Sequence, residues 1–148
     1  MEIFVGSDYR GFRQKDEIVK FLIEKNYSVS DLGTYSEEED DFNDAAIKVS
    51  KSVRENPGSY GILICDSAHG MTMQANRFKG IRAAHCANTE SAQLAREHDD
   101  ANILCLSAHD AESSKMERIV SVFLETDFEV FERRVRRINR LDEREDYD

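Results

Sequence analysis

The chain has 148 residues, of which 40% are hydrophobic and 34% charged, and a formal net charge of -10. This length fits one domain over 1–148 with an ordinary core. No apolar run approaches the roughly 18 residues of a membrane span, and the acidic balance excludes a broad nucleic-acid surface, which would need a basic face. Three cysteines, with no secretory signal at the N-terminus, predict a soluble, cytoplasmic protein with reduced thiols that handles small molecules.

The first half of the chain predicts two short strands, each followed by a helix. Ile3–Val5 is the first apolar run, and the apolar residues after it recur at helical spacing: Phe12, Ile18, Val19, Leu22 and Ile23. Tyr27–Val29 is a weaker strand, and residues 33–41 form an acidic loop. Ala45–Val53 predicts a second helix, which the Asn-Pro-Gly sequence at 56–58 ends.

The second half predicts three more strands. Gly61–Ile64 is almost entirely aliphatic, as expected of a strand that is buried on both faces. The turn Cys65–Gly70 and a short helix, Met71–Arg77, follow it. The remaining predicted strands and helices, in chain order, are Ile81–Ala84, Thr89–Glu97, Asn102–Leu106 and Ala111–Leu124.

Five strands separated by helices predict a parallel sheet with right-handed crossovers and helices on both faces, a three-layer α/β/α sandwich. In such folds ligands bind at the carboxyl ends of the strands, near the point where the strand order reverses. Three turns follow strands and are therefore the places to search: Gly6–Gly11, Cys65–Gly70 and Ser107–Asp110. The first turn lacks the middle glycine of a dinucleotide fingerprint.

Residues 128–148 predict a charged helix that carries five arginines, followed by an acidic tail from about 141 to 148. So charged a helix cannot be a core element, and we expect it to lie across a neighbouring subunit or in solvent. Its arginines at 133–137 could bind phosphate, although a solvated face is the more common use of such residues.

Three residues beside the predicted strands could carry chemistry. Cys65, between a strand and a helix, is a candidate base or nucleophile, or else a buried structural cysteine. His98 is either a proton donor and acceptor or a favourable partner of the helix dipole. Asp8 either binds a sugar hydroxyl or caps the helix after it. Cys86 and Cys105 are predicted to be core residues.

Several stretches of the chain match, in order and spacing, the sequence pattern of a known protein family. They are Gly6–Asp8 with Gly11-Phe12, Asp31–Ser36, Gly61–Cys65, Ala75–Ala83, Ser91–Arg96 with His98, and Asn102–Leu104. Through them the chain, roughly from Met1 to Arg140, resembles the ribose-5-phosphate isomerase B family, which includes the galactose-6-phosphate isomerase subunits.

This resemblance implies a Rossmann-like fold that works as a homodimer or a dimer of dimers, with the C-terminal helix reaching over the partner. It also implies interconversion of aldose and ketose sugar phosphates through an enediolate, without metal or organic cofactor. Cys65 would then be the base, His98 would open the sugar ring, and Asp8 would bind a hydroxyl. The turn Asp66–Gly70 would donate N–H groups to the enediolate oxygen.

The chain differs from the family pattern at several of these positions. The family turn Cys-Gly-Thr-Gly-x-Gly is here Cys-Asp-Ser-Ala-His-Gly, so Ser67 keeps a hydroxyl while Asp66 places a carboxylate beside the thiol. Ala68 restricts a position where the family has glycine. With Cys65, His98 and Ser67 as the catalytic set, the implied substrate-binding set is Asp8, Tyr9, Asp66, Ala68, His69, Gly70, Asn76, Asp99, His109 and Arg134.

Four further differences concern phosphate and sugar contacts. Tyr9 replaces a histidine, His109 and Val130 replace arginines, and Asp99 replaces an asparagine. Cations are lost and carboxylates gained, which predicts weaker phosphate affinity. Three readings follow: an isomerase of this family whose substrate can differ from ribose 5-phosphate, a silent member that binds a sugar or a protein, or a divalent metal site. The candidate ligands of that metal site are Asp66, Asp99, His69, His98 and His109.

Overall fold

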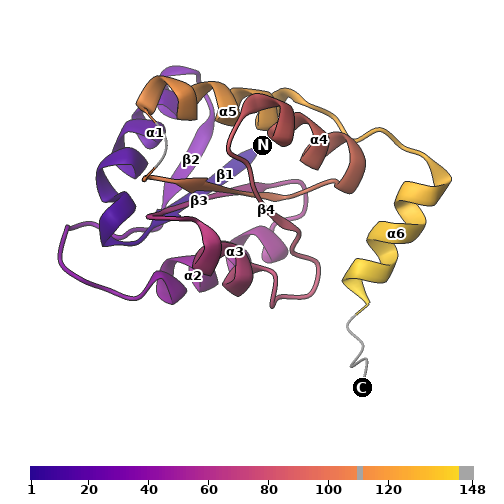
Figure 1. The fold of residues 1–148 in the computed structure, drawn as a ribbon, viewed down its shortest axis with the longest axis horizontal. Helices are drawn as coiled ribbons and strands as arrows, with labels where there is room; N and C mark the ends of the chain where they lie inside the picture. The colour runs from indigo at the N-terminus through magenta and orange to yellow at the C-terminus, as the bar shows by residue number, and fades with distance from the viewer. Residues whose placement is uncertain (110–111, 144–148) are drawn as a thin grey trace.

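The computed structural model describes residues 1–109 and 112–143, and a five-stranded parallel sheet lies at its centre (Figure 1). Its strands are β1 (Glu2–Ser7), β2 (Ser28–Asp31), β3 (Tyr60–Cys65), β4 (Ala83–His85) and β5 (Ile103–Ser107). They are arranged in the order β2-β1-β3-β5-β4, so the order reverses between β1 and β3. A reversal of this kind opens a crevice at the carboxyl ends of the two strands, where doubly wound folds bind ligands.

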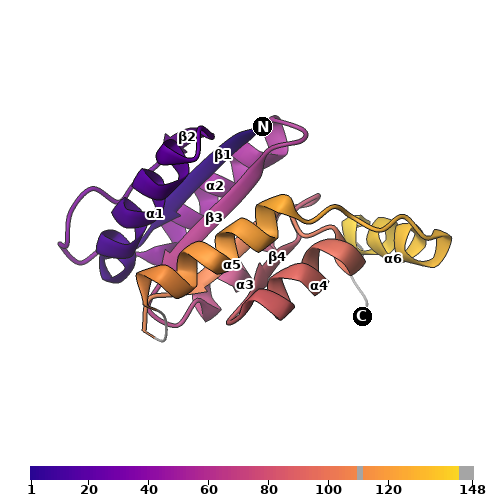
Figure 2. The same ribbon diagram turned by 90° about the horizontal axis from the view of Figure 1, so that it is seen from above.

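Helices cover both faces of the sheet, which confirms the predicted Rossmann-like, three-layer architecture. The helices are the short 3-10 helix η1 (Tyr9–Gly11), α1 (Phe12–Glu24), α2 (Phe42–Glu55), α3 (His69–Ala75), α4 (Thr89–Asp99), α5 (Ser113–Glu125) and α6 (Glu132–Asp142). Figures 1 and 2 show α1, α4 and α5 on one face, α2 and α3 on the other, and α6 standing apart beyond α4.

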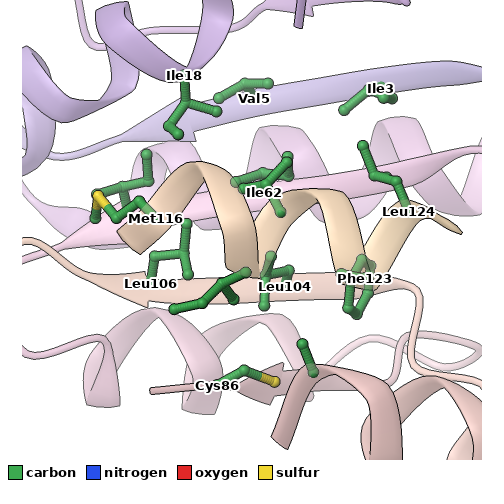
Figure 3. Close-up of a cluster of buried hydrophobic side chains, with 14 of the residues drawn as sticks. Ile3, Val5, Ile18, Ile62, Cys86, Leu104, Leu106, Met116, Phe123 and Leu124 are labelled. Atoms are coloured by element: carbon green, nitrogen blue, oxygen red, sulfur yellow. The ribbon is translucent and has the colours of Figure 1, made fainter. Parts of the chain in front are cut away.

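The three central strands, β1, β3 and β5, are buried on both faces, and successive side chains of each strand point to opposite sides of the sheet. Ile62 and Ile64 of β3 pack into the core under α1 and α5, which Figure 3 shows around Ile62, Leu104 and Phe123. Leu63 and Cys65 point to the other side and belong to the core under α2 and α3. Cys86 and Cys105 are buried, as predicted.

One strand begins later than its sequence predicts. β4 starts at Ala83 rather than Ile81, because the backbone N–H groups of the two preceding residues are used elsewhere. Ile81 N donates to Phe78 O in a turn, at 3.1 Å, and Arg82 N donates to the Asn102 side chain at 2.8 Å.

The last helix also begins later, at Glu132 instead of residue 128. The segment before it is held to the end of α4, where Glu129 N donates to Glu97 O at 3.1 Å. Within α6, Ile138 is buried, whereas Leu141 is 64% exposed, so the helix lies outside the core as expected. Of the predicted acidic tail, residues 144–148 lie outside the described part of the chain.

No helix among the described residues has the length and apolar character that crossing a membrane requires.

Candidate active site

Cys65 is the last residue of β3, beside the point where the strand order reverses. Its side chain is buried, and its Sγ accepts a hydrogen bond from Ala68 N at 3.2 Å. Burial raises the pKa of this thiol, and the negative charges of Asp8 and Asp66 raise it further, whereas the N–H groups of Ala68 and Met71 lower it. The sulfur is therefore held in place by the turn that follows it, and its surroundings favour the protonated thiol over the thiolate.

The turn from Asp66 to Gly70 leads directly into α3. Ala68 adopts a left-handed conformation with φ of 70°. This conformation is unfavourable for a residue with a side chain and easy for glycine, which the family has at this position. Gly70 is required by packing, because a Cβ atom there would lie 2.6 Å from the Phe42 ring. His69 N donates to Ser67 Oγ at 3.4 Å. Cys65 Sγ and Ser67 Oγ thus already accept hydrogen bonds from the N–H groups of Ala68 and His69, two of the groups expected to face an enediolate.

Asp8 follows β1 and caps η1. Its Oδ1 accepts hydrogen bonds from Arg10 N at 3.1 Å and Gly11 N at 3.0 Å, which is the capping role considered from the sequence. Burial raises the pKa of Asp8 and the two backbone donors lower it, while the charges of Asp40 and Asp66 add to the increase. The carboxylate is therefore rigidly placed at the carboxyl end of β1, next to Cys65.

A cleft of about 300 Å³ lies over these two residues. Its lining comes from the end of β1, the turn after β3 and the loop before α2: Asp8, Tyr9, Arg10, Glu39, Asp40, Asp41, Phe42, Asn43, Cys65, Asp66, Ser67 and Gly70. Asp40 Oδ1 accepts from Tyr9 N at 2.9 Å, which ties the loop to the cleft. We did not predict from the sequence that residues 39–43 line the cleft. The run of acidic residues at 37–41 was the pattern that could have indicated it.

The third post-strand turn joins the same region. Ser107 Oγ donates to Asp66 O at 2.6 Å, and His109 N donates to the same carbonyl at 3.0 Å. The Asp66 side chain lies near two basic groups, with its Oδ2 4.0 Å from Arg10 Nη1 and its Oδ1 3.8 Å from His109 Nδ1. Asp110, the last residue of this predicted turn, lies outside the described residues.

His98 and Asp99 lie toward the amino ends of the strands, whereas Cys65 lies at the carboxyl ends. Both are exposed at the end of α4, in a separate pocket of about 420 Å³. This end of α4 precedes β5, whereas Cys65 is in register with Ser107, the last residue of β5. The length of β5 from Ile103 to Ser107 puts about 13 Å between the two edges, at about 3.3 Å per residue. Within one chain, His98 and Cys65 therefore line separate pockets.

Arg134 lies near His98 rather than near Cys65. Its Nη1 donates to Glu97 O at 3.1 Å and to Glu129 Oε2 at 2.9 Å, and its guanidinium stacks on the Phe131 ring at 4.7 Å. The predicted site residues thus fall into two groups, one toward the carboxyl ends of the strands and one toward their amino ends.

Two predicted substrate contacts have structural partners. The Asn76 side chain accepts from Ala83 N at 2.8 Å and donates to Ala83 O at 2.9 Å, so it holds the start of β4. The exposed His69 ring meets His85 edge to face, with the ring centres 5.9 Å apart.

The metal-site reading finds no support in the described part of the chain, where no group of three or more His, Cys, Asp and Glu side chains is placed to hold a metal ion.

Known proteins resemble this chain over nearly its full length. A model of the ribose/galactose isomerase family matches residues 3–141, and the chain therefore belongs to this family, a class of aldose–ketose isomerases. Among curated relatives, a probable ribose-5-phosphate isomerase B of Mycoplasma pneumoniae is 41% identical over 86% of this chain and 84% of that protein. Ribose-5-phosphate isomerase B of Escherichia coli is 38% identical over 86% of each chain.

Solved structures agree with the sequence relatives. Ribose 5-phosphate isomerase of Thermotoga maritima matches with a TM-score of 0.92 and 41% identity, covering 95% of this chain and 97% of that one. Ribose-5-phosphate isomerase B of Mycoplasma genitalium, solved with bound ribulose 5-phosphate, matches with a TM-score of 0.91 and 40% identity, over 95% of this chain and 93% of that one. The protein is thus an isomerase of the type B ribose-5-phosphate isomerase fold.

Proposed function

We propose that this protein interconverts ribose 5-phosphate and ribulose 5-phosphate, or a closely related sugar phosphate, through an enediolate. The observation that carries the proposal is the placement of the Cys65 thiol at the floor of a cleft beside the Asp8 carboxylate, at the reversal of the strand order. The names of the relatives support a five-carbon sugar phosphate as the substrate.

In this mechanism the Cys65 thiolate removes the proton on C2 of the open-chain aldose, and the same thiol returns a proton to C1 of the enediolate. The enediol proton moves between the two oxygens, so atoms and electrons balance without an external oxidant or cofactor. N–H groups of the turn after Cys65, with Ser67, stabilise the negative oxygen. Both capping bonds of Asp8 fall on Oδ1, and we assign Oδ2 to a sugar hydroxyl.

Ring opening requires a second copy of the chain. His98 and Arg134 belong to the opposite edge of the sheet, so a homodimer that places these residues of the partner over the Cys65 cleft would complete the site. The exposed apolar side chains around α6, Val130 at 75% and Leu141 at 64%, support a role of this helix in the dimer contact. Three buried, unpaired cysteines support a reducing compartment such as the cytoplasm, and the single sheet supports one domain.

The direct test is proton NMR in deuterated water with ribose 5-phosphate, galactose 6-phosphate and the free sugars, because it detects exchange at the carbon next to the carbonyl even when turnover is slow. Cys65→Ala should reduce the exchange rate by at least about 100-fold, the lower range for loss of a general base. Cys86→Ala is the matched control, since Cys86 is equally buried but packs in the other core.

Exchange at the wild-type rate in the Cys65→Ala variant would show that the base is another residue. Binding of a sugar by the wild-type protein without exchange for any sugar in the panel would instead favour a silent family member.

A further inference from the structure

Asp66 lies between the two basic side chains at the mouth of the Cys65 cleft. One carboxylate oxygen is 4.0 Å from Arg10 Nη1 and the other is 3.8 Å from His109 Nδ1. Arg10 is also oriented by Tyr9, because its Nε donates to the Tyr9 hydroxyl at 3.1 Å and its guanidinium stacks over that ring. The carboxylate therefore occupies the position from which an incoming anion would contact both groups.

The backbone fixes this arrangement. The carbonyl oxygen of Asp66 accepts from Ser107 Oγ at 2.6 Å and from His109 N at 3.0 Å. These bonds tie the turn after β3 to the turn after β5, so Asp66 and His109 keep their relative positions although both side chains are partly exposed. The fold thus sets the backbone positions of Asp66 and His109, and their side chains lie 3.8 Å apart.

The rest of the cleft offers an anion little else. Its other charged lining residues are four carboxylates, Asp8, Glu39, Asp40 and Asp41, and Arg10 is the basic residue among those that line it. A phosphate carries between one and two negative charges near neutral pH. It would therefore be repelled from most of the part of the cleft that this chain supplies, where Arg10 and His109 are the described groups that could attract it.

We propose that Asp66 is a specificity-determining residue that competes with the substrate's phosphate for Arg10 and His109. Its carboxylate acts as an internal anion, so it weakens the binding of phosphorylated sugars while leaving the contacts to sugar hydroxyls unchanged. This inference rests on the proposed function for the identity of the anionic group, a phosphate carried by the sugar. It adds that the affinity for this group is limited by one residue of the turn.

The test is calorimetric titration of the full-length protein with inorganic phosphate, ribose 5-phosphate and ribose. Asp66→Asn keeps the size of the side chain and removes its charge. We expect it to bind inorganic phosphate and ribose 5-phosphate about tenfold more tightly, a change of about 1.4 kcal/mol, and ribose unchanged. Asp41→Asn is the matched control: it removes a charge from the same cleft, at a side chain that makes no capping bond to α2.

Equal gains in Asp66→Asn and Asp41→Asn, or no gain in Asp66→Asn, would overturn the proposal, because only competition for Arg10 and His109 predicts a difference. Adding Arg10→Ala to Asp66→Asn should remove most of the gain, and a gain that survives this second change would also overturn it. Thermal unfolding of each variant checks the fold. Since inorganic phosphate binds without turnover, its titration keeps these outcomes distinct from a failure of the proposed isomerase activity, which the exchange experiment reports.

Discussion

The acidity of Cys65 is determined by opposing contributions from its neighbours. Burial raises the pKa of the thiol, and the negative charges of Asp8 and Asp66 act in the same direction. The N–H groups of Ala68 and Met71 partly offset this increase. The departure of the turn from the family pattern therefore has a direct chemical consequence, because Asp66 adds negative charge beside the group that becomes a thiolate in the proposed mechanism.

We expect kcat/KM for isomerisation to rise with pH from neutral into the alkaline range. A thiol whose pKa lies above its ordinary value is mostly protonated at neutral pH, so the active thiolate fraction increases about tenfold per pH unit until the pKa is reached. The pH profile of kcat/KM measures this. Asp66→Asn should move the profile to lower pH, whereas a profile that is flat from pH 7 to 9 would contradict Cys65 as the titrating base.

At the scale of the elements, a buried ion pair links α1 to the loop that reaches the cleft. Lys15 of α1 is fully buried, and its Nζ donates to both carboxylate oxygens of Asp31, at 2.8 and 2.7 Å. Asp31 Oδ1 in turn accepts from Gly33 N at 3.0 Å. Gly33 O accepts from Ser7 N at 2.7 Å. The pair therefore holds the start of the 33–41 loop against the end of β1, one residue before Asp8.

Replacing Lys15 by methionine should lower the free energy of unfolding by about 2 kcal/mol, because the partly buried Asp31 carboxylate would lose the donor to both of its oxygens. Urea unfolding measures the change. The matched control is Lys20→Met on the exposed side of the same helix, for which we expect a change below about 0.5 kcal/mol. Equal effects of the two substitutions would mean that the ion pair contributes nothing specific to stability.

At the scale of the whole molecule, the two groups of site residues occupy opposite edges of one sheet. Cys65, Asp8 and the acidic loop lie at the carboxyl ends of the strands. His98 lies at the end of α4, and Arg134 of α6 donates to Glu97 O beside it. The length of β5 alone is about 13 Å, and the two groups line separate pockets of one chain. In the proposed function, a site made of both groups is formed by two chains, with each supplying one half.

Mixing two inactive variants tests this arrangement. Cys65→Ala and His98→Ala should each be inactive as homodimers, but a mixed dimer contains one site with both residues intact. Random re-association of equal amounts should restore about a quarter of the wild-type activity, because half of the dimers are mixed and each has one intact site of two. Absence of any recovery, with mixed dimers demonstrated by mass spectrometry, would place Cys65 and His98 in the same chain's site.

The sequence by itself determined the layered fold and the end of the sheet at which Asp8 and Cys65 meet. Apolar strands of three to five residues between amphipathic helices can bury both faces only in a parallel sheet that is covered on two sides. The turns after β1 and β3 must then meet at one edge, which brought Asp8 and Cys65 together as predicted. These features follow from local patterns, because side-chain periodicity and strand direction are properties of short segments.

The tertiary structure decided what depends on contacts between distant segments. It placed Asp40 beside Tyr9, set Asp66 between Arg10 and His109, and started β4 two residues late, where the Asn102 side chain takes the N–H of Arg82. It also separated His98 from Cys65. The physical reason is that burial, charge pairing and the competition for a hydrogen-bond donor depend on residues far apart in the chain, whose meeting is determined by the packing of the whole sheet.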